Sequence, residues 1–258
     1  VSVAPDGSLF ITDWYDPGVG GHGIRDLGRG RVFRVAPPNT KYKVPTFDFK
    51  TAAGAVEALK NPNFAVRYLA WTALHGMGLK AEKELLGLYG SDNVRHRARA
   101  LWLLGKIEGR GAHYVELASG DKEEDIRVVS VRLARQLKQD MIPLIAKLAS
   151  DTSAPVRREC ALALRREKSD KAPALWAQLA AAHDGKDRWY LEALGLAADK
   201  QENKFFAAWV SETKLNTAAA RDIIWRNRGT HGAKFLADII LDKKTTESEK
   251  PRYIRALD

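Results

Sequence analysis

Cysteine is almost absent from this chain, which has only Cys160 among its 258 residues. No disulfide can therefore form within the chain, and no CxxC or CxxCH pair is available for zinc or a covalently attached haem. The six histidines include no two that lie three or four residues apart, so no helix offers a paired metal face. Charged residues interrupt every apolar run, and no transmembrane segment is expected. The sequence thus predicts neither a metal nor a cofactor site within this chain.

The chain also lacks an initiating Met and a basic, apolar leader, and it ends at Asp258 within a stretch predicted to be helical. We therefore expect an internal piece of a longer protein. The formal net charge is +10, and residues 1–50 contribute little to it, with seven Lys or Arg against five Asp or Glu. A solvated helical surface is the simplest explanation of this excess. Attraction of an acidic partner, nucleic acid or anionic lipid is the alternative.

What the sequence does contain is an arginine that recurs at intervals of 28 to 33 residues. The seven members are Arg67, Arg95, Arg127, Arg157, Arg188, Arg221 and Arg252. Asn61, Asp121 and Asp151 each stand six positions before their arginine. Seven equivalent residues cannot all be catalytic. We interpret them as a structural ladder, in which each arginine bonds an acidic residue or a helix end of an adjacent unit.

Each unit is predicted to hold a first amphipathic helix, a polar turn and a second helix that opens at the arginine. The first helices are expected at residues 51–60, 79–89, 111–118, 140–149, 171–182, 202–212 and 231–241. One helical pair cannot bury its apolar faces alone, whereas stacked neighbours share a continuous core.

A small residue lies three positions after the arginine in the first four units, which close helix packing requires. These residues are Ala70, Ala98, Ser130 and Cys160. Because its equivalents are Ala and Ser, Cys160 is interpreted as a buried structural residue rather than a nucleophile. The tryptophans within the predicted helices are interpreted as core residues, with stacking on nucleobases as the alternative. They are Trp71, Trp102, Trp176, Trp189, Trp209 and Trp225.

The recurring pattern D-x-x-x-x-V-R resembles the HEAT repeat, particularly its short bacterial variety. The resemblance covers most of the chain and implies a mainly α fold, a HEAT-like α-solenoid of about seven helical pairs. Its first four units match clearly, and the last three depart from the pattern because the acidic residue is displaced or missing. The expected organisation is a β piece over residues 1–40, a linker over 41–50 and the solenoid over 51–258.

The first 36 residues have a different pattern, in which VSVA, LFITDW and GRVFRVAP read as three strands. A glycine-rich loop with acidic and basic side chains connects the second and third predicted strands. A long loop of this kind is often functional, and a His within it could act as an acid–base group or metal ligand. The loop candidates are His22, Asp13, Asp26 and Arg31. A blade-closing loop, tied together by its own Asp and Arg side chains, is the structural alternative.

The N-terminal run VSVAPDGSLFITDWYDPGVG, followed by GRGRVFRVAP, resembles the closing blade of a β-propeller. It is similar to the membrane-bound dehydrogenase-type proteins of planctomycetes and verrucomicrobia, which combine a sugar dehydrogenase-like propeller, a HEAT-like region and a c-type haem domain. The resemblance implies an extracytoplasmic parent protein with a quinone and calcium in its propeller. Because no CxxCH occurs in this chain, a haem domain of the parent would lie after Asp258.

Three functions are compatible with these patterns. The first is a scaffold that joins a propeller to a downstream domain and binds a protein partner. The second is one edge of a propeller active site, contributed by the loop after residue 13. The third is nucleic-acid binding by basic residues on second helices, with Arg95 and Arg157 joined by further arginines. These further residues are Arg97, Arg99, Arg158, Arg165 and Arg166.

Overall fold

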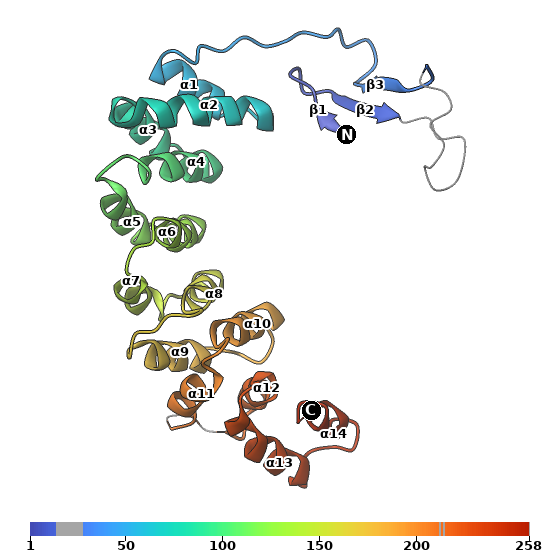
Figure 1. Ribbon diagram of the computed structural model, residues 1–258, viewed down its shortest axis with the longest axis vertical. Helices are drawn as coiled ribbons and strands as arrows, with labels where there is room; N and C mark the ends of the chain where they lie inside the picture. Colours follow the sequence, from blue (N-terminus) through green and yellow to red (C-terminus); the bar gives the residue numbers. More distant parts are fainter. Residues whose placement is uncertain (14–27, 212, 214, 258) are drawn as a thin grey trace. The chain divides into compact units, whose positions relative to one another are not determined.

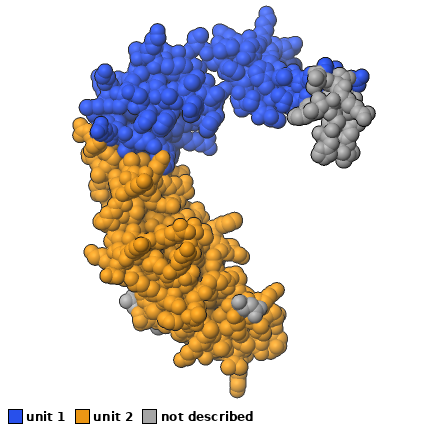
Figure 2. Space-filling view, in the orientation of Figure 1, with its two compact units in different colours: residues 1–108 blue, residues 109–258 orange. Residues whose placement is uncertain are grey.

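The computed structural model describes residues 1–13, 28–211, 213 and 215–257. Most of these residues are helical, and a small antiparallel sheet precedes the helices. Contacts divide the chain into two compact units, residues 1–108 and residues 109–258, which Figure 2 shows in blue and orange. None of the described helices is both long enough and apolar enough to cross a bilayer.

The three predicted strands are present and form one antiparallel sheet (Figure 1). They are β1 (Ser2–Val3), β2 (Leu9–Asp13) and β3 (Arg31–Val35), and they pair in that order. The sheet is too small to bury a face, because three short strands supply little apolar area. Val32 and Phe33 accordingly remain exposed.

The turn between β1 and β2 is closed by a carboxylate. Asp6 accepts hydrogen bonds from the backbone N–H of Ser8 (3.0 Å) and from its hydroxyl (2.6 Å). Arg34, on β3, adds a 2.7 Å ion pair to the other carboxylate oxygen. The serine hydrogen bonds and the guanidinium together lower the pKa of Asp6 to about 2. The side chains of this turn therefore hold the hairpin and the third strand together.

The first unit continues with four α-helices and a short 3-10 helix. Their bounds are α1 (Ala52–Leu59), α2 (Phe64–Met77), η1 (Gly78–Ala81), α3 (Glu82–Tyr89) and α4 (Val94–Leu104). Helix α1 packs on α2 and α3 packs on α4, and the two pairs contact each other through α1 with α3 and α2 with α4. The cap residue of α2 also contacts the sheet, since Asn63 donates its side-chain amide to the carbonyl of Ala4 (2.7 Å).

The second unit consists of further helices. They are α5 (Gly111–Ser119), α6 (Glu124–Gln136), α7 (Met141–Leu148), α8 (Ala154–Ala163), α9 (Ala172–Ala181), α10 (Arg188–Ala197), α11 (Glu202–Val210), α12 (Ala218–Arg226), η2 (Thr230–Gly232), α13 (Ala233–Leu241) and α14 (Lys250–Ile254). Helices α6, α8, α10 and α12 pack on one another in sequence order, while α7 packs on α9 and α9 on α11 (Figure 1). The main contacts of each helix in this unit are thus with helices one or two positions away along the chain.

In the first four helical pairs, the N-cap of the second helix recurs every thirty residues. The N-caps of α2, α4, α6 and α8 are Asn63, Asn93, Glu123 and Ser153. Three of these side chains accept hydrogen bonds from the first turn, which satisfies amides that would otherwise lack partners. The helices begin at these caps. The prediction that they open at the arginine is therefore wrong by a few residues in these four pairs.

The small packing residue follows the same period, seven positions after each cap. It is Ala70, Ala100, Ser130 and Cys160, and all four are fully buried. The predicted member Ala98 is wrong, because the cap at Asn93 places Ala100 at the equivalent position. Burial also raises the pKa of the Cys160 thiol to about 12, as expected for a packing residue that is not a nucleophile.

The tryptophans divide between core and surface. Trp176 and Trp209 are buried as predicted, and the indole N–H of Trp176 donates to the carbonyl of Leu194 (3.0 Å). For Trp189 the prediction of a core position is wrong, because 71% of this residue is exposed on α10. Trp71 and Trp102 are half-buried, and they belong to the surface described below.

Candidate functional site

Two of the four loop candidates fall within the described strands. Asp13 ends β2 and lies opposite Arg31, the first residue of β3. Arg31 donates its guanidinium to the backbone carbonyl of Arg29 (2.9 Å). His22 and Asp26 lie outside the described residues. In the described part of the loop region, these two residues therefore form the last pair of the β2–β3 ladder.

The repeated arginines close the turn of their own helical pair. Arg67, Arg127 and Arg157 each donate Nη1 to the two carbonyls that lie six and five residues earlier. The distances range from 2.5 to 3.1 Å. The acidic or amide residue of the repeat supplies the first of these carbonyls. Its side chain accepts the N–H two residues later, as Asp151 does from Ser153 (2.8 Å). Arginine and turn thus form one local clamp.

A second contact reaches the next helical pair through the other edge of the guanidinium. Arg127 donates Nε and Nη2 to the two carboxylate oxygens of Asp151, at 2.7 and 2.8 Å. The carboxylate raises the pKa of Arg127. Burial of Asp151 acts in the opposite direction, yet the bonds from Arg127 and Ser153 lower the pKa of Asp151 below its ordinary value. This fork is the interaction that the ladder interpretation predicts.

The C-terminal members of the set pair with carboxylates differently. Arg221 bonds Asp242, which follows α13 (2.5 Å), and Arg252 bonds Asp222 of α12 (2.6 Å). Arg188 instead pairs with Glu192 on its own helix, at 2.7 Å. The contacts of Arg221 and Arg252 reach another helical pair, as the ladder interpretation predicts, whereas Arg188 bonds within its own helix and departs from that interpretation.

In the second pair the structure assigns the repeat position to a different arginine. Arg97, rather than Arg95, lies four residues after the cap, as Arg67 and Arg127 do in their own helices. It donates Nε to the carbonyl of Tyr89 (3.0 Å). Arg95 lies two residues earlier and is exposed. With this correction the first four arginines follow the thirty-residue period of the caps.

The other predicted basic residues are divided between the two units. Arg99 donates to the carbonyls of Leu59 and Lys60 at the end of α1 (2.9 and 3.2 Å). Arg165 and Arg166 belong to the second unit, where both lie near the carboxylate of Asp199 (2.9 and 3.8 Å). Arg158 is half-buried on α8. Arg99, Arg165 and Arg166 therefore each have partners within their own unit.

The feature that sequence reasoning missed is an aromatic surface on α2 and α4. We call it the aromatic–arginine surface, and it consists of Leu59, Phe64, Arg67, Tyr68, Trp71, Arg99 and Trp102, which line a cavity of about 220 Å³. Phe64 and Tyr68 are 71% and 63% exposed. Aromatic residues four apart on one helix were the available signal, because such residues share a face. The structure alone shows that this face is uncovered.

The charge on this surface is of one sign. Helices α2 and α4 contain four arginines and neither Asp nor Glu. Burial lowers the pKa of Arg99, and the neighbouring charges of Arg67 and Arg95 lower it further. Burial and Arg99 likewise lower the pKa of His96. Mutual repulsion of this kind favours the approach of an anionic group.

A second aromatic cluster, on α10 and α12, is already neutralised. Arg252 lies 4.3 Å and Arg188 lies 5.8 Å from the ring centre of Trp225. Each of these arginines bonds a carboxylate, Asp222 for the first and Glu192 for the second. The cluster therefore carries less uncompensated charge than the aromatic–arginine surface.

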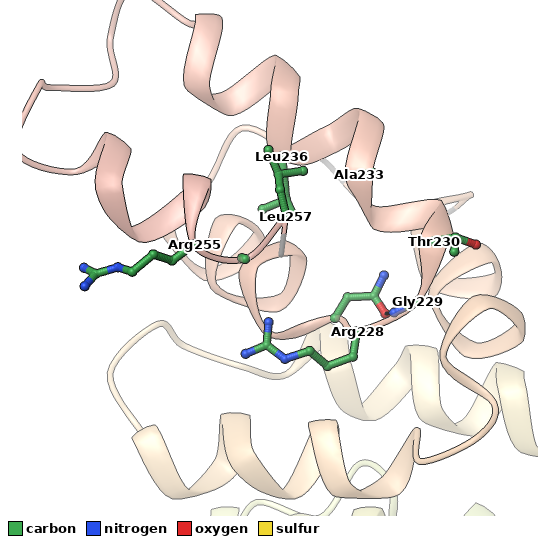
Figure 3. A pocket seen from close by; sticks show the side chains of 9 residues that line it. Arg228, Gly229, Thr230, Ala233, Leu236, Arg255 and Leu257 are labelled. Carbon is green, nitrogen blue, oxygen red and sulfur yellow. Dashed lines mark hydrogen bonds between the residues drawn. The ribbon is translucent and has the colours of Figure 1, made fainter.

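Another cavity, of about 370 Å³, lies between α13 and the segment after α14 (Figure 3). Leu236 and Leu257 lie side by side at its centre, and Arg228 and Arg255 point away from them. The lining also includes the polar residues Asn227 and Thr230, and because the two arginines point away from the centre we assign no site to this cavity. Over residues 1–13, 28–211, 213 and 215–257, no three His, Cys, Asp or Glu come together as metal ligands would.

Neither the models of known protein families nor the curated proteins match this chain.

Proposed function

We propose that this chain is a HEAT-type α-solenoid that acts as a protein-interaction scaffold. The observation that supports the proposal is the thirty-residue recurrence of cap, arginine and buried small residue. Units that recur in this way contact mainly their neighbours, and their stacked helices present an extended surface to a partner.

The larger protein proposed here is an extracytoplasmic one, in which the scaffold follows a sugar or alcohol dehydrogenase-like propeller. The support is the resemblance of the first 36 residues to a closing blade. A c-type haem would belong to another part of that protein, because this chain contains no CxxCH, and a quinone with calcium would belong to the propeller. The reading frame around this segment tests the proposal. Blade-like repeats upstream and a CxxCH downstream are expected, and their absence would overturn it.

Removal of one whole repeat tests the solenoid. Excision of residues 124–153 joins the Glu123 cap to α8, so that α5 would pair with α8 in place of α6. We expect the shortened chain to unfold cooperatively with proportionally less helical circular dichroism. A matched excision of residues 124–138 removes half a repeat, and we expect it to abolish cooperative unfolding. Loss of cooperativity in both variants would contradict a modular stack.

Binding tests the scaffold role. We expect the chain to bind separately produced flanking segments of its own gene product in a pull-down, and to bind them again after purification. Flanking segments that show no affinity for the chain at low salt would count against the scaffold.

Nucleic-acid binding is the second candidate, and the four arginines on α2 and α4 favour it. Binding of this kind would weaken steeply as salt rises, because each phosphate contact releases a counterion. Titration of labelled duplex and single-stranded DNA over a range of salt concentrations measures this dependence. A flat response, or no binding at low salt, would exclude it.

A further inference from the structure

We propose that the aromatic–arginine surface docks an acidic peptide segment that carries one apolar anchor side chain. The inference rests on the proposed scaffold function and names the partner chemistry. Its central element is an unfilled position in the arginine ladder.

Arg127 shows how a complete position of the ladder is occupied. Its Nη1 holds the two carbonyls of its own turn, and its Nε and Nη2 hold the carboxylate of Asp151, 24 residues further along the chain. A guanidinium edge of this kind matches a carboxylate bidentately. The molecule itself therefore provides the template for what this edge binds.

Arg67 has the first half of this arrangement and lacks the second. Its Nη1 donates to the carbonyls of Asn61 and Pro62, and no described residue accepts from its Nε or Nη2. The residue 24 positions further along is Ser91, whose side chain is too short and has no charge. The edge that takes a carboxylate in Arg127 is thus left for a carboxylate from outside.

Arg99 repeats the same pattern on α4. Both of its hydrogen bonds leave from Nη1, toward the carbonyls of Leu59 and Lys60, and its Nε and Nη2 have no acceptor within the described part of the chain. Arg67 and Arg99 both line the same cavity. A segment with two acidic residues could therefore engage both edges.

The cavity between these arginines selects an apolar side chain. Its volume of about 220 Å³ lies below the roughly 300–1,000 Å³ of small-molecule sites. Phe64, Tyr68, Trp71 and Trp102 form most of its wall. Exposed aromatic side chains beside arginine are the residues that anchor protein interfaces. One Leu, Ile, Phe or Trp of a partner would cover them.

Two of the aromatic rings, those of Phe64 and Trp71, already have neighbouring side chains over them. His75 stacks on Trp71 with ring centres 4.8 Å apart, and Lys106 lies 5.7 Å from the centre of the same ring. Arg67 lies over Phe64 at 5.4 Å. Base stacking needs an open ring face, so these contacts favour a peptide over a nucleic acid.

Selection from a random peptide display library against the full chain tests the proposal. We expect the enriched peptides to carry Asp or Glu on both sides of one apolar residue. The decisive variant is Ser91→Asp, which places a carboxylate where Asp151 stands relative to Arg127. This internal carboxylate should occupy Arg67, raise or preserve the urea midpoint, and weaken the selected peptides about tenfold or more.

Two further variants keep the test independent of folding. Tyr68→Ala removes an exposed ring and should weaken the peptides at least about fivefold with little change in the urea midpoint. Arg188→Ala, in the second unit, is the matched control and should leave peptide binding unchanged. Enrichment without acidic residues, no enrichment, or unchanged binding by Ser91→Asp would overturn the proposal. So would a single-stranded oligonucleotide that binds this surface more tightly than the peptides do.

The outcomes separate this proposal from the scaffold function. Flanking segments that still bind Ser91→Asp and Tyr68→Ala would leave the scaffold intact and remove this surface from it. If the wild-type chain did not bind the flanking segments, the scaffold function would be refuted, whether or not the peptides bind.

Discussion

The bidentate ion pair between Arg127 and Asp151 should contribute measurably to the stability of the second unit. Substitutions at Asp151 can separate the contribution of the ion pair from that of the turn. The two side chains are only 14% and 8% exposed. Removing one member of such a pair leaves the other charge without its partner, which costs about 3 kcal/mol at this depth of burial. Asp151→Ala also loses the hydrogen bond from Ser153, worth about 1 kcal/mol. We therefore expect Asp151→Ala to lower the free energy of unfolding by about 3–4 kcal/mol.

Asp151→Asn separates the turn from the charge. Asn61 occupies the equivalent position in the first pair and accepts the same N–H at the same 2.8 Å distance. An asparagine should therefore preserve the turn and one acceptor for Arg127. We expect a loss of about 1.5–2 kcal/mol, roughly half that of the alanine variant.

Urea unfolding followed by circular dichroism measures these differences, provided that the variants share the slope of unfolding free energy against urea concentration. Lys204→Ala is the matched control, because Lys204 pairs with the fully exposed Asp170. Such a surface pair contributes less than about 1 kcal/mol. The reasoning would be refuted if Asp151→Ala cost no more than the control. If Asp151→Asn alone were neutral, the turn rather than the ion pair would be the stabilising element.

The remaining predictions concern single groups. The thiol of Cys160, whose pKa burial raises to about 12, should react with a disulfide reagent only after urea unfolding, and rapid labelling of native protein would contradict its burial. Because the pKa of Asp6 is about 2 in the folded sheet and 3.8 without it, its contribution to stability should be complete above pH 3.8 and lost as the pH falls toward 2. Carboxyl chemical shifts followed through an acid titration measure the pKa of Asp6 in the folded protein. A pKa near 3.8 would contradict the hydrogen bonds and the ion pair of this turn. Arg97→Ala should lower the urea midpoint more than Arg95→Ala, because Arg97 bonds the carbonyl of Tyr89, and the reverse order would restore the arginine register expected from the sequence.

Prediction from sequence succeeded where local pattern determines structure. The three strands and the first helices follow from alternation and from apolar periodicity, and both signals lie within a few neighbouring residues. The arginine register failed in the second pair because R-H-R-A-R offers three arginines within five positions. Only the cap at Asn93 shows that Arg97 is the equivalent residue, and a cap is defined by backbone geometry.

The aromatic–arginine surface was not predictable for a related reason. Trp176 and Trp71 both lie on helices and both were expected in the core, yet only Trp176 is buried there. Exposure of an aromatic side chain depends on which neighbouring element covers it. That neighbour is distant in sequence, and its identity is not encoded in the helix itself.

By itself, the sequence determined the helical class, the small sheet and a repeat of about thirty residues, because each arises from the periodicity of short segments. Only the tertiary structure decided which guanidinium edges meet a carboxylate and which do not. Arg127 and Arg67 stand at equivalent positions in the repeat, yet Asp151 reaches one and Ser91 leaves the other without a charge partner. The physical reason is that a bidentate ion pair requires two side chains in fixed orientation, and packing between helical pairs sets that orientation.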